Sequence, residues 1–244
     1  MPRMLPILIR WLERKIENRS MVDTTPFIPA EQFEWAPELE RNWREIRAEL
    51  DAILARPAEV PNFQDISADQ RRLTTDDRWK TFFLKAYGFP MKRNRGRCPR
   101  TVEALRRIPG VTTAFFSILG PGKRIPEHRG PYRGVVRYHL GLKIPRPETS
   151  CGISVGGQTA HWREGSGLFF DDTYPHEAWN STDDDRAVLF LDVVRPMRFP
   201  YSWLNQLVIR AIGRSRFVRE VRLNQAAWDR ELDSGMRAAS GGPS

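Results

Sequence analysis

Residues 134–144 read Gly-Val-Val-Arg-Tyr-His-Leu-Gly-Leu-Lys-Ile, and this stretch decides the fold class of the chain. It is rich in β-branched and aromatic residues and lies between Gly and Pro residues, as is typical of a strand. Similar runs separated by Gly and Pro occur at 79–86, 112–119, 151–155, 167–171, 176–180 and 186–194. A short helix is expected around 99–107, where Pro99 suits the first turn. Many short strands with turn signals predict a mainly β domain, a sandwich or a closed barrel such as a jelly-roll.

Helical periodicity occurs on both sides of this β region. Steps of four and three between Pro37 and Pro57 predict one amphipathic helix, and its apolar positions are Leu39, Trp43, Ile46, Leu50 and Ile53. A second helical pattern follows Arg195, with one face formed by Trp203, Leu204, Leu207, Val208, Ala211 and Ile212. We therefore expect an N-terminal helical extension (1–75) packing on the barrel, a jelly-roll domain (76–196), basic amphipathic helices (197–235) and a loose tail (236–244).

The chain has 244 residues and a net charge of +9, which implies an anionic partner. Charge alone does not choose between nucleic acid, phospholipid and an acidic small molecule. The two cysteines, Cys98 and Cys151, lie far apart, so neither a disulfide framework nor a zinc knuckle is predicted and a reducing cytoplasm fits best. Arg10 breaks the N-terminal apolar stretch before signal-peptide length, and no run approaches the roughly 20 apolar residues of a spanning helix.

Two histidines are candidates for a metal site. His128 follows a Gly/Pro-rich loop and His176 precedes a strand, and in a jelly-roll this separation can bring both to the same barrel mouth. Imidazole suits a first-row metal such as iron(II), but the carboxylate that usually stands two residues after the first histidine is replaced by Gly130. From the spacing alone, packed or exposed histidines remain the more common interpretation.

Arg186 opens the apolar strand 186–194, where an inward guanidinium needs an anionic partner such as a carboxylate ligand. A salt bridge to Asp172, Asp192 or another acidic residue, or a position in solvent at the strand end, is the alternative. Arg137 and His139 alternate on one strand face, so both can point into the same cavity or lie on a solvated face of the sheet.

A series of motifs between Ser117 and Pro196 resembles the aspartyl/asparaginyl β-hydroxylase family. In order, the motifs are His-x-Gly-Pro, Arg-x-His-Leu-Gly-Leu, Trp-x-x-Gly, Phe-Asp-Asp-x-x-x-His-Glu-x-Trp and a downstream Arg followed by Asp-Val. The resemblance implies a double-stranded β-helix, which is a cupin-like jelly-roll. It also implies an iron(II)- and 2-oxoglutarate-dependent hydroxylase, in which O2 yields succinate, CO2 and one oxygen inserted into a substrate C–H bond.

The resemblance also assigns roles to individual residues. His128 and His176 would be the iron ligands with no protein carboxylate, so that Gly130 conforms to the family pattern. Asp172 would accept a hydrogen bond from an iron-bound water. The remaining roles concern 2-oxoglutarate, whose far carboxylate would be held by Ser117 and Arg186, with His139 at its near end and Arg137 in support.

The substrate stays open between a membrane-lipid acyl chain, slightly favoured, and an Asp or Asn side chain. The segment with Leu8, Leu12 and Ile16 among Arg14 and Lys15, like 203–219, has the composition of helices that lie on an anionic membrane surface. Packing of both helices on the barrel is weighted slightly higher. A cytoplasmic protein with peripheral contact to the inner face of the membrane is the corresponding expectation.

The rival class is a non-catalytic β-barrel module that binds an anionic lipid or nucleic acid. The basic loop 91–100 lacks the interleaved aromatic residues of nucleic-acid-binding surfaces, so nucleic acid is not favoured. His161 lies outside the motif positions and is interpreted as a packing or surface histidine.

Overall fold

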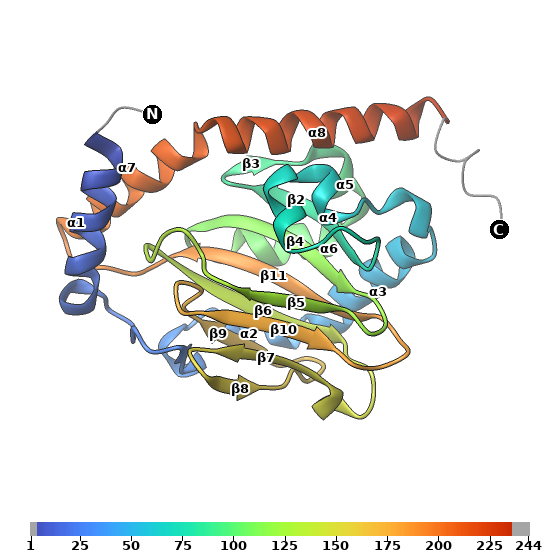
Figure 1. Ribbon diagram of the computed structural model, residues 1–244, viewed down its shortest axis with the longest axis horizontal. Coiled ribbons are helices and arrows are strands. Elements are labelled where there is room, and N and C mark those ends of the chain that lie inside the picture. Colours follow the sequence, from blue (N-terminus) through green and yellow to red (C-terminus); the bar gives the residue numbers. More distant parts are fainter. Residues whose placement is uncertain (1–3, 236–244) are drawn as a thin grey trace.

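The computed structural model describes residues 4–235, so the predicted tail 236–244 and the side chain of Leu8 lie outside the described residues. Two antiparallel sheets face each other (Figure 1). The large sheet has the order β1-β9-β6-β11-β4-β2-β3, with bounds Phe27–Ile28, Gly167–Phe170, Val135–Lys143, Arg186–Val194, Val111–Leu119, Trp79–Ala86 and Phe89–Pro90. The small sheet has the order β5-β10-β7-β8, with bounds Arg124–His128, His176–Asn180, Cys151–Val155 and Gln158–Ala160.

From β4 to β11 the chain alternates between the large and the small sheet, and only the β7–β8 hairpin departs from this rule. This alternation is the double-stranded β-helix, so the predicted jelly-roll class is confirmed. Each of the seven predicted strands is present with ends within one residue of those expected. The sequence pattern did not predict β5 or the short strands β1, β3 and β8.

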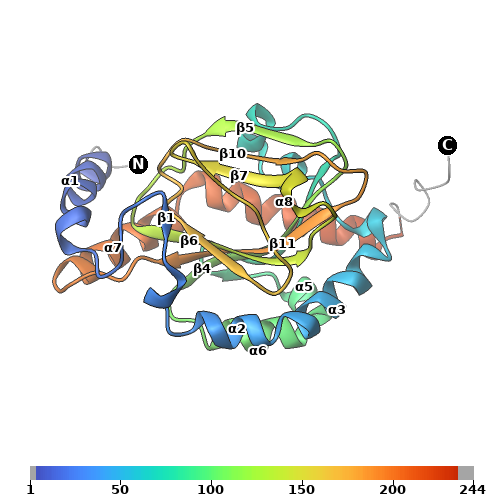
Figure 2. The same cartoon turned by 90° about the horizontal axis from the view of Figure 1, so that it is seen from below.

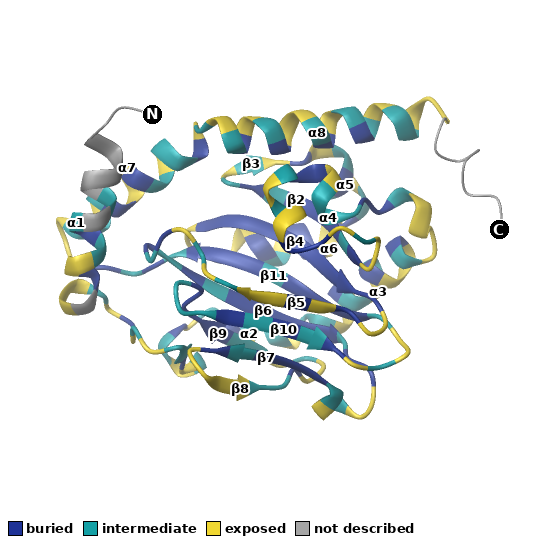
Figure 3. Ribbon diagram, viewed as in Figure 1, coloured by how far each residue is buried: buried dark blue, intermediate teal, exposed yellow. Residues whose placement is uncertain are grey.

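Strand β5 was missed because it lies at the edge of the small sheet and is mostly exposed, unlike the buried β4 and β11 (Figure 3). Its sequence, Arg-Ile-Pro-Glu-His, contains Pro126, which cannot donate to a ladder and is confined to edges. Charged residues and proline on an edge strand also prevent pairing with other chains.

Helices cover the outer face of the large sheet (Figure 2). They are α2 (Ala36–Arg41), α3 (Trp43–Leu54) and α6 (Pro99–Arg106), next to α5 (Lys92–Arg97). Leu39, Ile46, Leu50 and Ile53 are buried against this face, as their periodicity predicted. The single helix predicted between Pro37 and Pro57 is wrong, because the helix breaks at Asn42.

The terminal helices lie at two further places. Helix α8 (Arg216–Asp233) runs past β2 and β3 and contacts the short α4 (Phe63–Ile66) beneath it (Figure 1). The 3-10 helix η3 (Ala68–Arg72) packs on α4. Helix α1 (Met4–Arg19) packs on α7 (Tyr201–Gly213), where Leu12 and Ile16 contact the cluster of Val208. The apolar side chains described in α1 are thus covered by α7 and its neighbours rather than by the sheets. No helix in the described part of the chain has the length and apolar character needed to cross a bilayer.

Candidate active site

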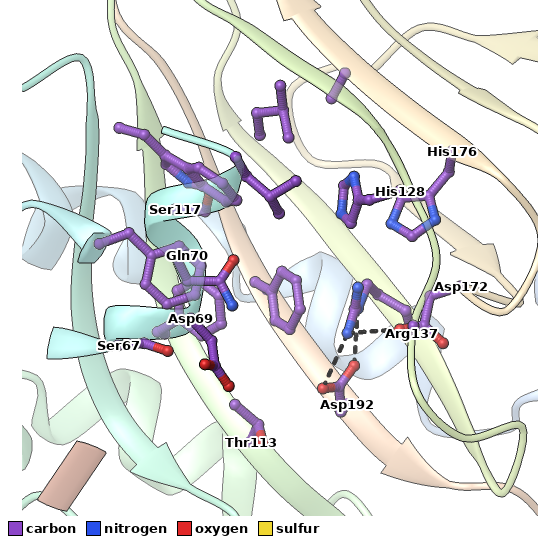
Figure 4. Close-up of a pocket in the computed structure, with 18 of the residues that line it drawn as sticks. Ser67, Asp69, Gln70, Thr113, Ser117, His128, Arg137, Asp172, His176 and Asp192 are labelled. Carbon is purple, nitrogen blue, oxygen red and sulfur yellow. Dashed lines mark hydrogen bonds and ion pairs between the residues drawn. The ribbon is translucent and has the colours of Figure 1, made fainter. Parts of the chain in front are cut away.

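His128 and His176 meet because their strands are neighbours in the small sheet. His128 ends β5, His176 begins β10, and the antiparallel register places the two residues directly opposite each other. Their ring centroids lie 4.1 Å apart (Figure 4). The structure therefore brings together the two imidazoles that the sequence singled out, and their role as metal ligands stays a prediction.

Each histidine ring is oriented by the backbone carbonyl of the residue two positions before it. Nδ1 of His128 lies 2.8 Å from the carbonyl oxygen of Pro126, and Nδ1 of His176 lies 3.0 Å from that of Tyr174. A proton on Nδ1 donates to the carbonyl, which leaves the Nε2 lone pair available. Burial lowers the pKa of His176 to about 3, assisted by His128, and burial also lowers the pKa of His128. Both rings are thus neutral at neutral pH, which is the form that binds metal.

Gly130 stands where a ferrous site would usually have its carboxylate, and the structure shows what fills that space. A Cβ atom added at Gly130 would lie 1.9 Å from Oδ2 of Asp172. The amide N–H of Gly130 also donates to the carbonyl oxygen of Asp172, at 2.7 Å. The Asp172 carboxylate therefore occupies the volume that a side chain at position 130 would need.

Asp172 is buried and held by Arg137. Nη2 of Arg137 lies 2.9 Å from Oδ2 of Asp172, while its Nε lies 2.9 Å from Oδ1 of Asp192 (Figure 4). Burial raises the pKa of Asp172, and the positive charge of Arg137 opposes that rise. The structure shows Arg137 bridging two carboxylates, and its predicted support of the co-substrate remains a prediction.

Arg186 is, among the described residues, the buried cation that has no acidic partner. Its side chain is 2% exposed, and Nε and Nη1 have no hydrogen-bond partner within residues 4–235. The alternative salt bridge to Asp172 or Asp192 is not formed, since both carboxylates pair with Arg137. The guanidinium lies over the ring of Trp162, 4.4 Å from its centroid. Burial lowers the pKa of Arg186 to about 10, so the group remains charged at neutral pH.

Other polar groups near Arg186 are also available to a ligand. Both ring nitrogens of His139 are buried with no hydrogen-bond partner in the described chain, and burial keeps its pKa well below the usual value. The Ser117 hydroxyl accepts a hydrogen bond from Trp79 Nε1 at 3.1 Å, which leaves its own proton to donate. A cation, a hydroxyl and an imidazole are the donor set that a small carboxylate ligand requires.

All seven residues predicted for the site line one cavity of about 320 Å³ between the two sheets: Ser117, His128, Arg137, His139, Asp172, His176 and Arg186. Neither His161 nor the basic loop 91–100 takes part. His161 bonds through Nδ1 to the Cys151 carbonyl and packs edge-on against Trp179. Trp162 was not singled out beforehand, although the Trp-x-x-Gly motif contains it.

The chemistry of these residues suits a metal held by few protein ligands. In the described residues no cluster of three or more His, Cys, Asp or Glu side chains could hold a metal. A metal here would depend on the two Nε2 atoms and on ligands from outside the chain. The unpaired Arg186 and His139 fit a carboxylate that would supply such ligands.

A jelly-roll whose buried polar groups gather between its two sheets defines the class of the protein. The family model for aspartyl/asparaginyl β-hydroxylase matches residues 40–196, and the chain belongs to this family. It is accordingly a hydroxylase, and the rival interpretation as a non-catalytic module is not favoured.

Individual relatives add detail. Rhizobium tropici ornithine lipid ester-linked acyl 2-hydroxylase is 43% identical over 232 residues, covering 95% of this chain and 83% of that protein. Human aspartyl/asparaginyl β-hydroxylase is 31% identical over 175 residues, covering 68% of this chain and 22% of that protein. Among solved structures, the Schizosaccharomyces pombe Cnp3 cupin domain has a TM-score of 0.35 and 9% identity, covering 60% of this chain and 80% of that one.

Proposed function

We propose that this protein is an iron(II)- and 2-oxoglutarate-dependent hydroxylase that acts on a lipid-linked acyl chain. The observation that carries the proposal is one cavity that holds two adjacent, neutral histidines and a buried arginine with no acidic partner in residues 4–235. When bound, iron and 2-oxoglutarate supply with O2 the oxidising power that no side chain has, and succinate, CO2 and a hydroxylated product result.

The chain itself would bind and orient these groups. The Nε2 atoms of His128 and His176 hold the metal, and each ring is kept in place by its Nδ1 hydrogen bond. Arg186 and Ser117 hold the far carboxylate of 2-oxoglutarate, and His139 lies at its near end. Asp172, fixed by Arg137, would accept a hydrogen bond from a water molecule at the metal. The apolar cluster around Val188 excludes bulk water from this pair of sheets.

The acyl substrate is supported by the relative named as an acyl 2-hydroxylase, which matches nearly the whole chain. An Asp or Asn side chain is the second candidate, supported by the family name and by the human relative. Mass spectrometry decides between them: lipid extracts from expressing cells should contain a product heavier by one oxygen atom. The same increase in peptides and not in lipids would overturn the acyl assignment.

Turnover is tested by succinate formation from 2-oxoglutarate with ferrous iron. His176→Ala should abolish it, whereas His161→Ala, which changes a histidine outside the cavity, should keep it. Equal loss in both variants would indicate a structural effect. Full activity of His176→Ala would refute the metal assignment.

We further propose peripheral contact with an anionic membrane through the surface at α7. Phe199, Trp203 and Leu207 follow one another at steps of four, with exposures of 84%, 56% and 38%, and Met21 nearby is 65% exposed. Arg198 and Arg19 adjoin this row, since the Arg198 amide bonds to the Arg19 carbonyl. Exposed aromatic residues beside arginines are the composition of an interfacial surface. Such contact would place the protein on the inner face of the membrane, in the cytoplasm.

A further inference from the structure

The cavity continues beyond the histidines into a part that the reaction chemistry does not require. On the inner face of the large sheet it is lined by Phe83, Phe115 and Phe190, and it reaches Phe217 and Val221 on α8. We call this part the aromatic arm. The rings form a continuous row, because Phe190 and Phe115 lie 4.1 Å apart and Phe115 and Phe83 lie 4.6 Å apart between centroids.

Among the described residues, the aromatic arm offers no unpaired charge. Its buried carboxylate, Asp192, is paired with Arg137, and its other polar groups are uncharged: the hydroxyls of Ser67, Thr113 and Tyr87 and the amide of Gln70. Burial raises the pKa of Tyr87, which keeps the phenol neutral. The charged residues that line the cavity on this side, Asp69 and Arg72, are solvent-exposed and so belong to its mouth. A carboxylate entering the arm would lose its water without gaining a cationic partner, whereas a hydrocarbon chain has no such cost and would pack on the row of rings.

Helix α8 closes the aromatic arm. It is fixed along its length by bonds from Asn224 to the Ile66 carbonyl and from Arg93 to the Asp229 carbonyl. Val221 and Phe217 belong to one cluster with Phe83 and Phe115. Leu223 lies only two positions from Val221 yet is 62% exposed, so the two residues face opposite ways.

The position of α8 in the sequence relates the aromatic arm to acyl substrates. The family model ends at residue 196, before α8 begins. The alignment with the acyl hydroxylase leaves only 244 − 232 = 12 residues of the chain uncovered, fewer than the 18 residues of α8. The helix that closes the aromatic arm is thus added to the family domain and is at least partly shared with a relative named for an acyl substrate.

We propose that the aromatic arm is an acyl-chain binding site, and that Phe217 and Val221 of α8 limit the length of chain it accepts. This inference rests on the proposed function for the identity of the substrate. Chain binding itself requires only the arm. It can therefore be measured without metal, 2-oxoglutarate or turnover.

The test measures displacement of a fluorescent fatty acid from the full-length, metal-free protein by saturated fatty acids of increasing length. Affinity should rise about fourfold for each added methylene, up to the length at which the chain meets α8, and then level off. Val221→Phe should move this plateau to shorter chains, and Phe217→Ala should move it to longer ones. Leu223→Phe adds the same ring on the opposite face and should leave the plateau unchanged.

Each outcome decides. Affinity independent of chain length, or equal plateaus in Val221→Phe and Leu223→Phe, would overturn the acyl-chain site. If Val221→Phe does not fold, the opposite shift expected for Phe217→Ala still tests the proposal. Failure of the proposed function would appear separately, as absence of succinate formation in a protein whose chain-length plateau moves as described.

Discussion

Replacing Arg186 by methionine should separate binding of the co-substrate from stability of the fold. The guanidinium is 2% exposed, and two of its nitrogens lack partners in the described residues. If these nitrogens bind a carboxylate, each charge-assisted hydrogen bond contributes about 1.5–3 kcal/mol. Loss of two such bonds, about 3–6 kcal/mol, should weaken 2-oxoglutarate binding by roughly 10²–10⁴-fold.

Stability of the metal-free fold should change little in the same variant. Methionine removes a buried charge that has no acidic partner in the described part of the chain, and leaving such a group unsatisfied costs about 1–3 kcal/mol or more. This gain offsets the lost cation–π contact with Trp162, which is worth roughly 2 kcal/mol when desolvated. The free energy of unfolding of Arg186→Met should therefore stay within about 2 kcal/mol of the parent.

Arg195→Met is the matched control, because Arg195 is equally buried but fully paired. Its Nη2 lies 2.8 Å from Oδ2 of Asp171, and its other nitrogens bond to the carbonyls of Arg133 and Asp23. Its replacement should cost about 3–5 kcal/mol. Urea unfolding gives both free energies, and calorimetry with a redox-inert divalent metal gives the affinity for 2-oxoglutarate. Equal destabilisation by the two substitutions, or unchanged affinity in Arg186→Met, would refute the assignment of Arg186.

Three further substitutions test other parts of the structure. Gly130→Ala forces a methyl group onto the Asp172 carboxylate and should reduce turnover at least tenfold. Gly96→Ala, where the added methyl group meets open space, should keep the parent rate. Equal rates in the two variants would contradict the close approach of Asp172 to position 130. Ser117→Ala removes one hydrogen bond to an anion, about 1.5–3 kcal/mol, and should raise the Kd for 2-oxoglutarate roughly 10–100-fold by calorimetry. Trp203→Ser should reduce co-sedimentation with vesicles containing anionic lipid and leave succinate formation with a soluble substrate unchanged; undiminished sedimentation would exclude this surface.

The strands of the jelly-roll were predictable because their burial follows directly from side-chain pattern. The continuous burial of β4 and of residues 138–142 in β6 follows from their runs of apolar, β-branched and aromatic residues. The order of the motifs, through the family resemblance, predicted that the site residues lie together, and each of the seven predicted residues lines the cavity. The register that places His128 opposite His176 could not be predicted, because it depends on β5. The polar sequence of this edge strand has no strand signal.

The orientation of α7 shows a different limit of sequence reasoning. The apolar period placed Trp203 and Leu207 on the packed face together with Val208, but the first two are exposed. Asn205 is fully buried instead, and it accepts a hydrogen bond from the Tyr132 hydroxyl while donating to the Gly134 carbonyl. A polar residue whose hydrogen bonds are all satisfied can thus determine which face of a helix is buried. The sequence alone does not show that its hydrogen-bond partners exist.

Gly130 and Asp172 depend on each other although they lie far apart in the sequence. Asp172 needs the volume that only glycine leaves free, and Gly130 in turn donates its amide to the backbone of Asp172. A carboxylate at position 130 would compete with Asp172 for the same space beside Arg137. The absence of the usual acidic residue after His128 is therefore not a loss of negative charge at the site. The charge is supplied from the segment just before β10, on a carboxylate that Arg137 keeps in place.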